Sequence, residues 1–160
     1  FITVQNHYNL IFREEEREMI PCCRDSGIAV TPYSPLAGGR LSRAPGVETR
    51  RLREDSYAHL KYDAARDQDM EVVERVRSVA QDHGVSMTQV SLAWLLRRAD
   101  APVVGATSPM QIADACGATE LSLTDSEVAW LEEPYTPHRL VGVMAQNTAE
   151  DAGCKHVWMR

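Results

Sequence analysis

The sequence lacks an excess of positive charge. Of its 160 residues, 17 are Lys or Arg and 23 are Asp or Glu, so the formal net charge at pH 7 is -6. Proteins that bind nucleic acids without sequence specificity gather Lys and Arg against the phosphate backbone. The charge balance therefore argues against nucleic acid as a partner. The apolar fraction of 44% and the charged fraction of 25% are typical of an ordinary globular domain.

The sequence also lacks the features of secreted, zinc-binding and membrane proteins. Its four cysteines, Cys22, Cys23, Cys116 and Cys154, fit neither a zinc-ligand spacing nor a disulfide framework. No apolar run approaches the roughly 20 residues that a membrane helix needs. No charged stretch followed by an apolar run opens the chain, as a signal peptide would. We therefore expect reduced thiols in a cytoplasmic protein without metal or membrane contact.

Short apolar runs alternate with amphipathic helical patterns along the chain. Runs suited to buried strands lie at residues 2–4, 28–30 and 102–104. Helical patterns lie at residues 13–24, 70–83, 88–96, 108–116 and 123–131. This alternation predicts an α/β fold with parallel strands. Closing a barrel takes about eight strands, and the chain begins without Met inside a strand, so we expect upstream chain or partner chains to complete the sheet.

Local signals place the ends of several predicted helices. Thr88 and Ser108 are positioned as N-caps, and Pro109 follows Ser108 at the first helical position. Thr124 with Glu127 forms a capping-box pattern. Residues 37–69 have no clean period, which predicts a long loop with a helical turn near residues 57–64.

Polar and aromatic residues follow each predicted strand, at residues 5–8, 33–35 and 105–107. Parallel α/β folds place their ligands at these strand ends. The ring of Tyr33 could stack on a flat heterocycle, and Ser34 could meet phosphate oxygens. A buried tyrosine followed by strand-ending prolines is the structural alternative.

The other candidate residues have structural alternatives as well. The hydroxyl of Ser108 stands beside a helix N-terminus, which suits an anion, but helix capping explains it equally. Arg43 could be the counter-charge of a pyrophosphate or an ordinary solvated arginine. His7 could be proposed as an acid, but a lone histidine after a strand is more often a structural hydrogen-bonding group.

Four short segments carry a family resemblance. They are VQNHYN at residues 4–9, TPYSPLAGG at 31–39, VSLAWL at 90–95 and VGATSPMQ at 104–111. In this order they resemble the aldo/keto reductases, closest to the bacterial branch related to the potassium-channel β subunits. The resemblance implies a (β/α)8 TIM barrel, of which this chain holds strands six to eight and the C-terminal helices. Residues 1–140 would form this part of the oxidoreductase domain, and residues 141–160 match nothing in the family.

The resemblance implies that NADP lies extended across the strand ends. The residues that would contact it are Gln5 at the carboxamide, Tyr33 on the nicotinamide ring, Ser34, Leu36, Gly38 and Arg43 at the pyrophosphate, Gly105, Thr107 and Gln111 in the segment facing the 2′-phosphate, and Asp114 at the adenine amine. Two positions depart from the family pattern. Relatives usually carry Asn at the position of Ala115, which removes one adenine contact. Many carry Arg or Lys at the position of Gln111, which weakens the expected preference for NADP over NAD.

The resemblance also places the catalytic residues outside this chain. The Asp, Tyr, Lys and His of the family come from earlier strands, and the Ser-Asn pair that grips the carboxamide belongs to the fifth. The complete enzyme is expected to reduce aldehydes or ketones with NADPH, and this chain alone is expected to be inactive because it lacks the proton donor. One alternative is a non-catalytic module that binds nucleotide or assembles half-barrels. Another is a structural relic without ligand.

Overall fold

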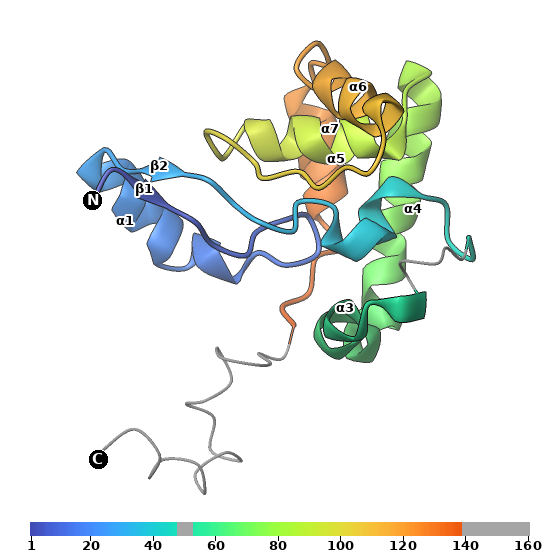
Figure 1. The fold of residues 1–160 in the computed structure, drawn as a ribbon, viewed down its shortest axis with the longest axis horizontal. Coiled ribbons are helices and arrows are strands. Elements are labelled where there is room, and N and C mark those ends of the chain that lie inside the picture. Colours follow the sequence, from blue (N-terminus) through green and yellow to red (C-terminus); the bar gives the residue numbers. More distant parts are fainter. Residues whose placement is uncertain (48–52, 139–160) are drawn as a thin grey trace, which may run out of the picture.

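The computed structural model describes residues 1–47 and 53–138, and Figure 1 shows their arrangement. The strands are marked β, the α-helices α and the 3-10 helices η. In chain order the elements are β1 (Thr3–Val4), η1 (Glu14–Glu16), α1 (Met19–Ser26), β2 (Ala29–Val30), η2 (Ala37–Ser42), α3 (Ser56–Tyr62), η3 (Asp63–Ala65), α4 (Arg66–His83), α5 (Met87–Leu96), α6 (Pro109–Gly117) and α7 (Asp125–Glu132). The predicted tail at residues 141–160 lies outside the described residues.

The sheet is small and parallel, as the sequence predicts. β1 pairs with β2, with Thr3 opposite Ala29. Two isolated parallel bridges extend this pairing, from Tyr33 to His7 and from Tyr33 to Val103. The predicted third strand is therefore a short extended segment beside the end of β2, with a single bridge. Three chain segments run in parallel, and their polar ends meet at one side of the sheet.

Glycines and capping side chains delimit the helices. α1 ends at Gly27 and α4 at Gly84, both with a φ of 65°, which residues with a side chain rarely adopt. α6 begins as predicted, because the side chain of Ser108 accepts a hydrogen bond from the N–H of Gln111 and Pro109 takes the first helical position.

The N-cap of α5 differs from the prediction. The capping residue is Ser86, whose side chain accepts from the N–H of Gln89, and not Thr88. The reason lies in the preceding helix. Gly84 ends α4, and the N–H of Val85 donates back to the carbonyl of Ala80 at 2.9 Å. Ser86 is then the first residue free to cap the next helix.

Residues 37–69 hold more regular structure than the predicted loop. α3 and η3 together cover the expected helical turn, but η2 is an additional element and α4 begins at Arg66 instead of residue 70. Asp55 starts α3 by accepting a hydrogen bond from the N–H of Ala58 at 2.9 Å. The mixed composition of this segment hides the helices, because few apolar residues mark their buried faces.

The core lies where α5 packs against α4, α7 and the segment that follows β1. α5 is buried on nearly all sides, and its buried residues are Met87, Val90, Ser91, Leu92, Ala93, Trp94 and Leu95. α6 carries no buried residue. Figure 1 shows α1 with the two strands at one end of the molecule and the helices α4 to α7 at the other. η2 packs against α5, α3 and α4.

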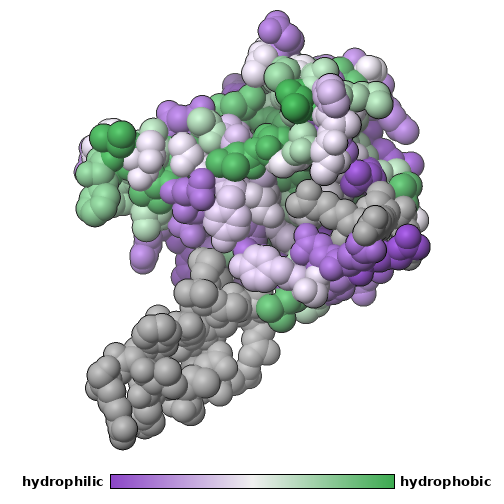
Figure 2. All heavy atoms as spheres, in the orientation of Figure 1, coloured by the Kyte–Doolittle hydropathy of each residue, from purple (hydrophilic) through white to green (hydrophobic). Residues whose placement is uncertain are grey.

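Several large apolar side chains remain on the surface. Figure 2 shows hydrophobic residues at the end of the molecule that holds β1 and again beside α5 and α6. Among the described residues, those with the largest exposed fractions are Phe1, Ile2, Met110, Leu60 and Ile112. Ile2 is 84% exposed, and β1 pairs only with β2 in the described part of the chain. Within the described residues, one edge of the sheet is therefore open.

Glu127 links the predicted capping box to the pH dependence of stability. Its Oε2 accepts from the N–H of Thr124 at 2.7 Å, and its Oε1 lies 2.5 Å from Nε2 of His83. The hydrogen bond from the backbone of Thr124, followed by that of His83, lowers the pKa of Glu127 from its usual 4.5 to about 2. A depressed pKa in the folded state means that ionised Glu127 stabilises the fold above pH 4.5. This contribution is lost as the pH falls through about 2.

Glu127→Gln should therefore lower the melting temperature near neutral pH and have little effect at low pH. Thermal unfolding followed by circular dichroism across this pH range, with Glu120→Gln as the exposed control, measures the difference. A gap between wild type and Glu127→Gln that stays constant as the pH falls would contradict the role of the ionised carboxylate.

Candidate functional site

Tyr33 stands at the centre of the strand ends. Its backbone N–H donates to the carbonyl of Asn6 at 2.8 Å, and the carbonyl of the preceding Pro32 accepts from the N–H of Val103 at 2.8 Å. Tyr33 thus bridges the chain segments on both sides of it. Because parallel strands end on the same side of a sheet, the residues that follow β1, β2 and Val103 share one rim, which we call the strand-end rim.

His7 belongs to a buried hydrogen-bond cluster behind this rim. Its Nε2 lies 2.6 Å from the hydroxyl of Tyr62, and Nδ2 of Asn9 donates to the same hydroxyl at 3.1 Å and to the carbonyl of Ser34 at 2.9 Å. Burial, followed by the charge of Lys61, lowers the pKa of His7 to about 3. A neutral, buried and hydrogen-bonded imidazole supports the structural alternative for His7 and not the acid.

Lys61 reaches the strand-end rim from α3. Its Nζ donates to the hydroxyl of Tyr33 at 3.2 Å and lies 4.9 Å from the centre of that ring. The same ammonium lies 3.4 Å from Nδ1 of His7, whose ring stacks with that of Tyr33 at 5.3 Å. The Tyr33 ring is therefore held by two side chains from different segments. No sequence pattern indicates Lys61, because only the fold of residues 53–62 brings it to the rim.

The turn after β2 has an unusual backbone. Ser34 and Ala37 have φ values of 58° and 49°, and Gly38 and Gly39 have 65° and 99°. Positive φ costs little in glycine but is strained in serine and alanine, and such strain concentrates at ligand sites. Leu36 lies within the same turn and accepts from the N–H of Gly39 at 2.8 Å. The chain that leaves the rim is thus tightly folded directly after Tyr33.

The predicted residues near α6 form a separate group. Thr107 donates to Oε1 of Gln111 from its backbone N–H at 2.7 Å and from its hydroxyl at 3.1 Å. Both residues are exposed, as is Gly105 in the same loop. The carboxylate of Asp114, in contrast, already accepts from Ser86 at 2.8 Å and from Gln89 at 2.9 Å. It ties α6 to the start of α5.

The structure thus brings the predicted contact residues into three neighbourhoods. Gln5, exposed, and the half-buried Tyr33 and Ser34 lie at the strand-end rim; Leu36, Gly38 and Arg43 follow along η2; and the remainder surround the start of α6. Within the described residues, no hydrogen bond joins the third group to the first two.

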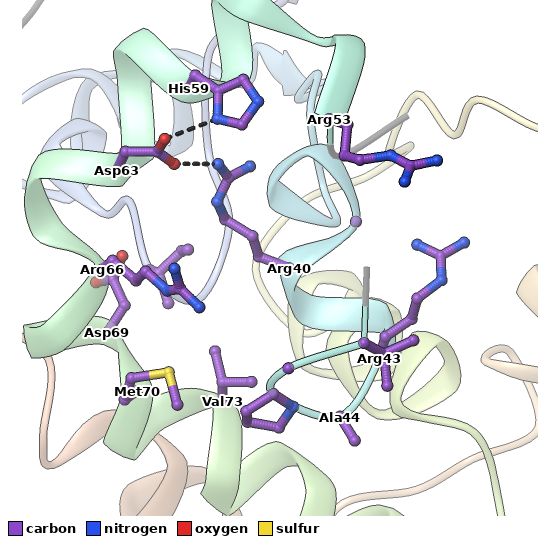
Figure 3. A pocket seen from close by; sticks show the side chains of 15 residues that line it. Arg40, Arg43, Ala44, Arg53, His59, Asp63, Arg66, Asp69, Met70 and Val73 are labelled. Atoms are coloured by element: carbon purple, nitrogen blue, oxygen red, sulfur yellow. Dashed lines mark hydrogen bonds and ion pairs between the residues drawn. The ribbon is translucent and has the colours of Figure 1, made fainter. Parts of the chain in front are cut away.

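A pocket of about 390 Å³ opens beside η2, between this element and α3 and α4. Figure 3 shows Arg40 and Arg66 on the side of Asp63, and Arg43 and Arg53 together across the pocket. Of the predicted contact residues, only Arg43 lines it. We call it the arginine pocket. No sequence pattern indicates this pocket, because its arginines lie up to 26 positions apart, in a segment without periodicity.

In the described ranges no group of three or more His, Cys, Asp or Glu side chains is arranged to hold a metal ion. The described cysteines, Cys22, Cys23 and Cys116, are free. None of the helices of residues 1–47 and 53–138 is both long and apolar enough to cross a bilayer.

Parallel strands followed by helices, with polar side chains at the strand ends, are features of α/β proteins, which as a class bind their ligands at one rim of the sheet. Residues 1–135 match the sequence model of the aldo/keto reductase family. The chain therefore belongs to the aldo/keto reductase family. The solved structure of a thermostable aldo-keto reductase, Tm1743, in complex with the inhibitor epalrestat has the same fold, with a TM-score of 0.60 and 21% sequence identity over 82% of this chain and 39% of that one.

Curated relatives have the same family membership. The aldo-keto reductase dtxS3 of Metarhizium robertsii is 43% identical over 89% of this chain and 39% of its own length. The putative aryl-alcohol dehydrogenase AAD16 of Saccharomyces cerevisiae is 38% identical, over 87% of this chain and 41% of its own length. The versiconal hemiacetal acetate reductase of Aspergillus parasiticus is 41% identical, over 86% and 41%. The chain thus spans about two fifths of the length of these relatives. The narrower resemblance to the potassium-channel β subunits stays a prediction.

Proposed function

We propose that this chain is the NADP(H)-binding portion of an aldo/keto reductase that, in its complete form, reduces aldehydes or ketones to alcohols. The observation that carries the proposal is the position of Tyr33, which is bridged to both neighbouring segments and followed by a strained turn. An aromatic ring fixed at the centre of the strand ends suits a flat ring such as nicotinamide. The reductases and the aryl-alcohol dehydrogenase among the relatives support a redox function.

The residues present fit an extended dinucleotide in most of its parts. Gln5 is exposed and its amide is available for a carboxamide, and Arg43 has no ion pair with any of the described residues. Thr107 and Gln111 are exposed at the start of α6, where N–H groups favour a phosphate. Asp114 fits less well, since a contact with the adenine amine would compete with its bonds to α5. When bound, the cofactor supplies the hydride.

The described residues include no group suited to donate the proton, so we propose that this chain alone does not reduce carbonyl compounds. Reduction needs an acid close to the carbonyl oxygen that gives up its proton near neutral pH. Burial raises the pKa of Tyr62 to about 12, and the pKa of His7 is lowered to about 3, so neither group suits this task. We propose that the catalytic groups belong to the part of the barrel that this chain does not span. The proposed partner is a small carbonyl compound in a cytoplasmic enzyme.

Tyr33→Ala should weaken NADPH binding to the 160-residue chain. An aromatic stacking contact is worth about 0.5–1.5 kcal/mol, which corresponds to a rise in Kd of roughly 2- to 13-fold. Titration followed by NADPH fluorescence measures it. Tyr57→Ala is the matched control, because Tyr57 is an exposed tyrosine of α3 that also contacts Lys61. Equal Kd values for both variants would remove Tyr33 from the site, and reduction of an aldehyde by the purified wild-type chain would refute the absence of a proton donor.

A second candidate is a non-catalytic module whose half-barrels assemble with one another. The open sheet edge favours it, since Phe1 and Ile2 expose apolar surface that a partner would cover. Size-exclusion chromatography with and without NADPH separates the two proposals. A stable dimer that binds NADPH would support self-association. Binding of NADPH by a monomer would favour the first proposal, in which the strand-end rim of a single chain binds the cofactor.

A further inference from the structure

Lys61 brings an uncompensated positive charge to the strand-end rim. Among the described residues it forms no ion pair, and its hydrogen-bonding partners are the hydroxyl of Tyr33 at 3.2 Å and Nδ1 of His7 at 3.4 Å. Burial, followed by the charge of Lys61, lowers the pKa of His7 to about 3, so this imidazole is neutral at pH 7. The proposed function uses the ring of Tyr33 but gives no role to the ammonium beside it.

The ammonium of Lys61 is held in place by aromatic side chains. Its Nζ lies 4.9 Å from the centre of the Tyr33 ring and 4.7 Å from that of the Tyr57 ring. The third partner, His7, is buried and is itself fixed by the hydroxyl of Tyr62, 2.6 Å from its Nε2. A charge that the fold already holds in position acts on a bound ligand without first being ordered.

The ring of Tyr33 is shared between His7, Lys61 and the proposed ligand. His7 stacks with Tyr33 at 5.3 Å between ring centres, and in the described part of the chain no second ring stacks with it. Lys61 contacts both stacked rings, so its ammonium lies at an edge that they share. A nicotinamide stacked on the half-buried Tyr33 would therefore lie in the electric field of this ammonium.

The two forms of the cofactor differ in the charge of the ring that Tyr33 is proposed to hold. Hydride leaves with both electrons of the broken bond, so the nicotinamide is neutral in NADPH and carries a positive charge in NADP+. Two like charges roughly 10 Å apart near a protein surface repel enough to change a Kd about 3- to 10-fold, and less at high salt. A fixed ammonium at this place therefore acts against the oxidised form alone.

We propose that Lys61 makes the strand-end rim discriminate between the two oxidation states of the cofactor, so that NADPH binds in preference to NADP+. The inference rests on the proposed function, because it requires the nicotinamide ring at Tyr33. Lys61 is a specificity-determining residue in this role and takes no part in proton transfer. Its effect favours loading with the reduced cofactor and release of the oxidised one.

Isothermal titration of the 160-residue chain with NADPH and with NADP+ tests this role. Lys61→Met removes the charge but keeps an unbranched side chain, and should lower the ratio of the NADP+ Kd to the NADPH Kd about 3- to 10-fold. Lys61→Arg keeps the charge and should preserve the ratio. Arg77→Met is the matched control, because it removes the same charge from an exposed position of α4, where Arg77 pairs with Glu74. It should leave the ratio as in wild type.

A merely structural role of Lys61 in holding Tyr33 predicts a different result. Both Kd values would then rise together in Lys61→Met at a constant ratio, and this outcome would overturn the proposal. Equal changes of the ratio in Lys61→Met and Arg77→Met would overturn it as well. If Lys61→Met fails to fold, Lys61→Gln and the wild-type ratio decide, since that ratio should fall as the salt concentration rises.

The same titrations separate this inference from the proposed function. Wild-type chain that binds neither NADPH nor NADP+ would overturn both. Binding of both forms with a ratio that Lys61→Met leaves unchanged would overturn the role of Lys61 and leave the proposed cofactor site standing.

Discussion

Replacing Trp94 by alanine should destabilise the fold by about 3–5 kcal/mol, the usual range for truncating a buried tryptophan. Trp94 has 0% of its surface exposed. Its ring contacts Tyr8 at 5.5 Å between ring centres and lies under the guanidinium of Arg98, 4.6 Å away. Its Nε1 donates to Glu132 at 2.8 Å. The substitution therefore removes core volume. It also removes the indole ring that covers Arg98 and the N–H group that donates to Glu132.

Urea unfolding monitored by circular dichroism measures this loss. Domains of this kind have a total stability of about 5–15 kcal/mol, so Trp94→Ala should lose a large share of it and unfold at a clearly lower urea concentration than wild type. Trp130→Ala is the control. Trp130 is 41% exposed, and within residues 1–47 and 53–138 the only aromatic or cation–π contact of its ring is with the guanidinium of Arg75. Its loss should cost about 0.5–1 kcal/mol. Similar midpoints for the two variants would show that α5 is not the centre of the core.

The local elements of the fold could be predicted where short-range chemistry decides them. Gly27 and Gly84 end their helices, and Ser108 and Thr124 start theirs, as the sequence indicates. The predicted element boundaries are wrong where a distant contact or a competing local motif determines the structure. Ser86 displaces the predicted cap because the end of α4 fixes where α5 begins.

The strand ends of the candidate site were predicted, but the side chains that surround them were not. The positions of Tyr33 and His7 follow from the parallel order of the strands. Lys61 and Tyr62 reach His7 from α3, 54 and 55 positions away in the sequence, through contacts that no local pattern encodes. The same holds for the arginine pocket, where α4 and η2 meet. Nothing in the spacing of Arg53 and Arg66 indicates that they face one cavity.

The structure also bears on how the α6 group could recognise the adenosine end of a dinucleotide. Oε1 of Gln111 accepts both hydrogen bonds from Thr107. The amide therefore points its nitrogen away from Thr107, and Nε2 has no recorded partner among the described residues. A free amide N–H group at a helix start is suited to donate to a phosphate oxygen. We infer that Thr107 orients Gln111 for the 2′-phosphate that distinguishes NADP from NAD.

Arg43→Ala and Gln111→Ala should affect the two cofactors differently in the complete enzyme. Arg43 is proposed to meet the pyrophosphate, which NADP and NAD share. Its loss should therefore raise both Kd values, by about 10- to 150-fold for a charge-assisted hydrogen bond of about 1.5–3 kcal/mol. Gln111→Ala should weaken NADP alone, because NAD has a hydroxyl where NADP has the phosphate. Arg77→Ala and Met110→Ala, at exposed positions on α4 and α6, are the matched controls. Fluorescence titration of both cofactors against both variants gives four changes in Kd. We expect both Kd values to rise in Arg43→Ala and only that of NADP to rise in Gln111→Ala. Equal losses of NADP and NAD in Gln111→Ala would show that α6 does not read the 2′-phosphate, and the assignment of NADP to this chain would then be wrong.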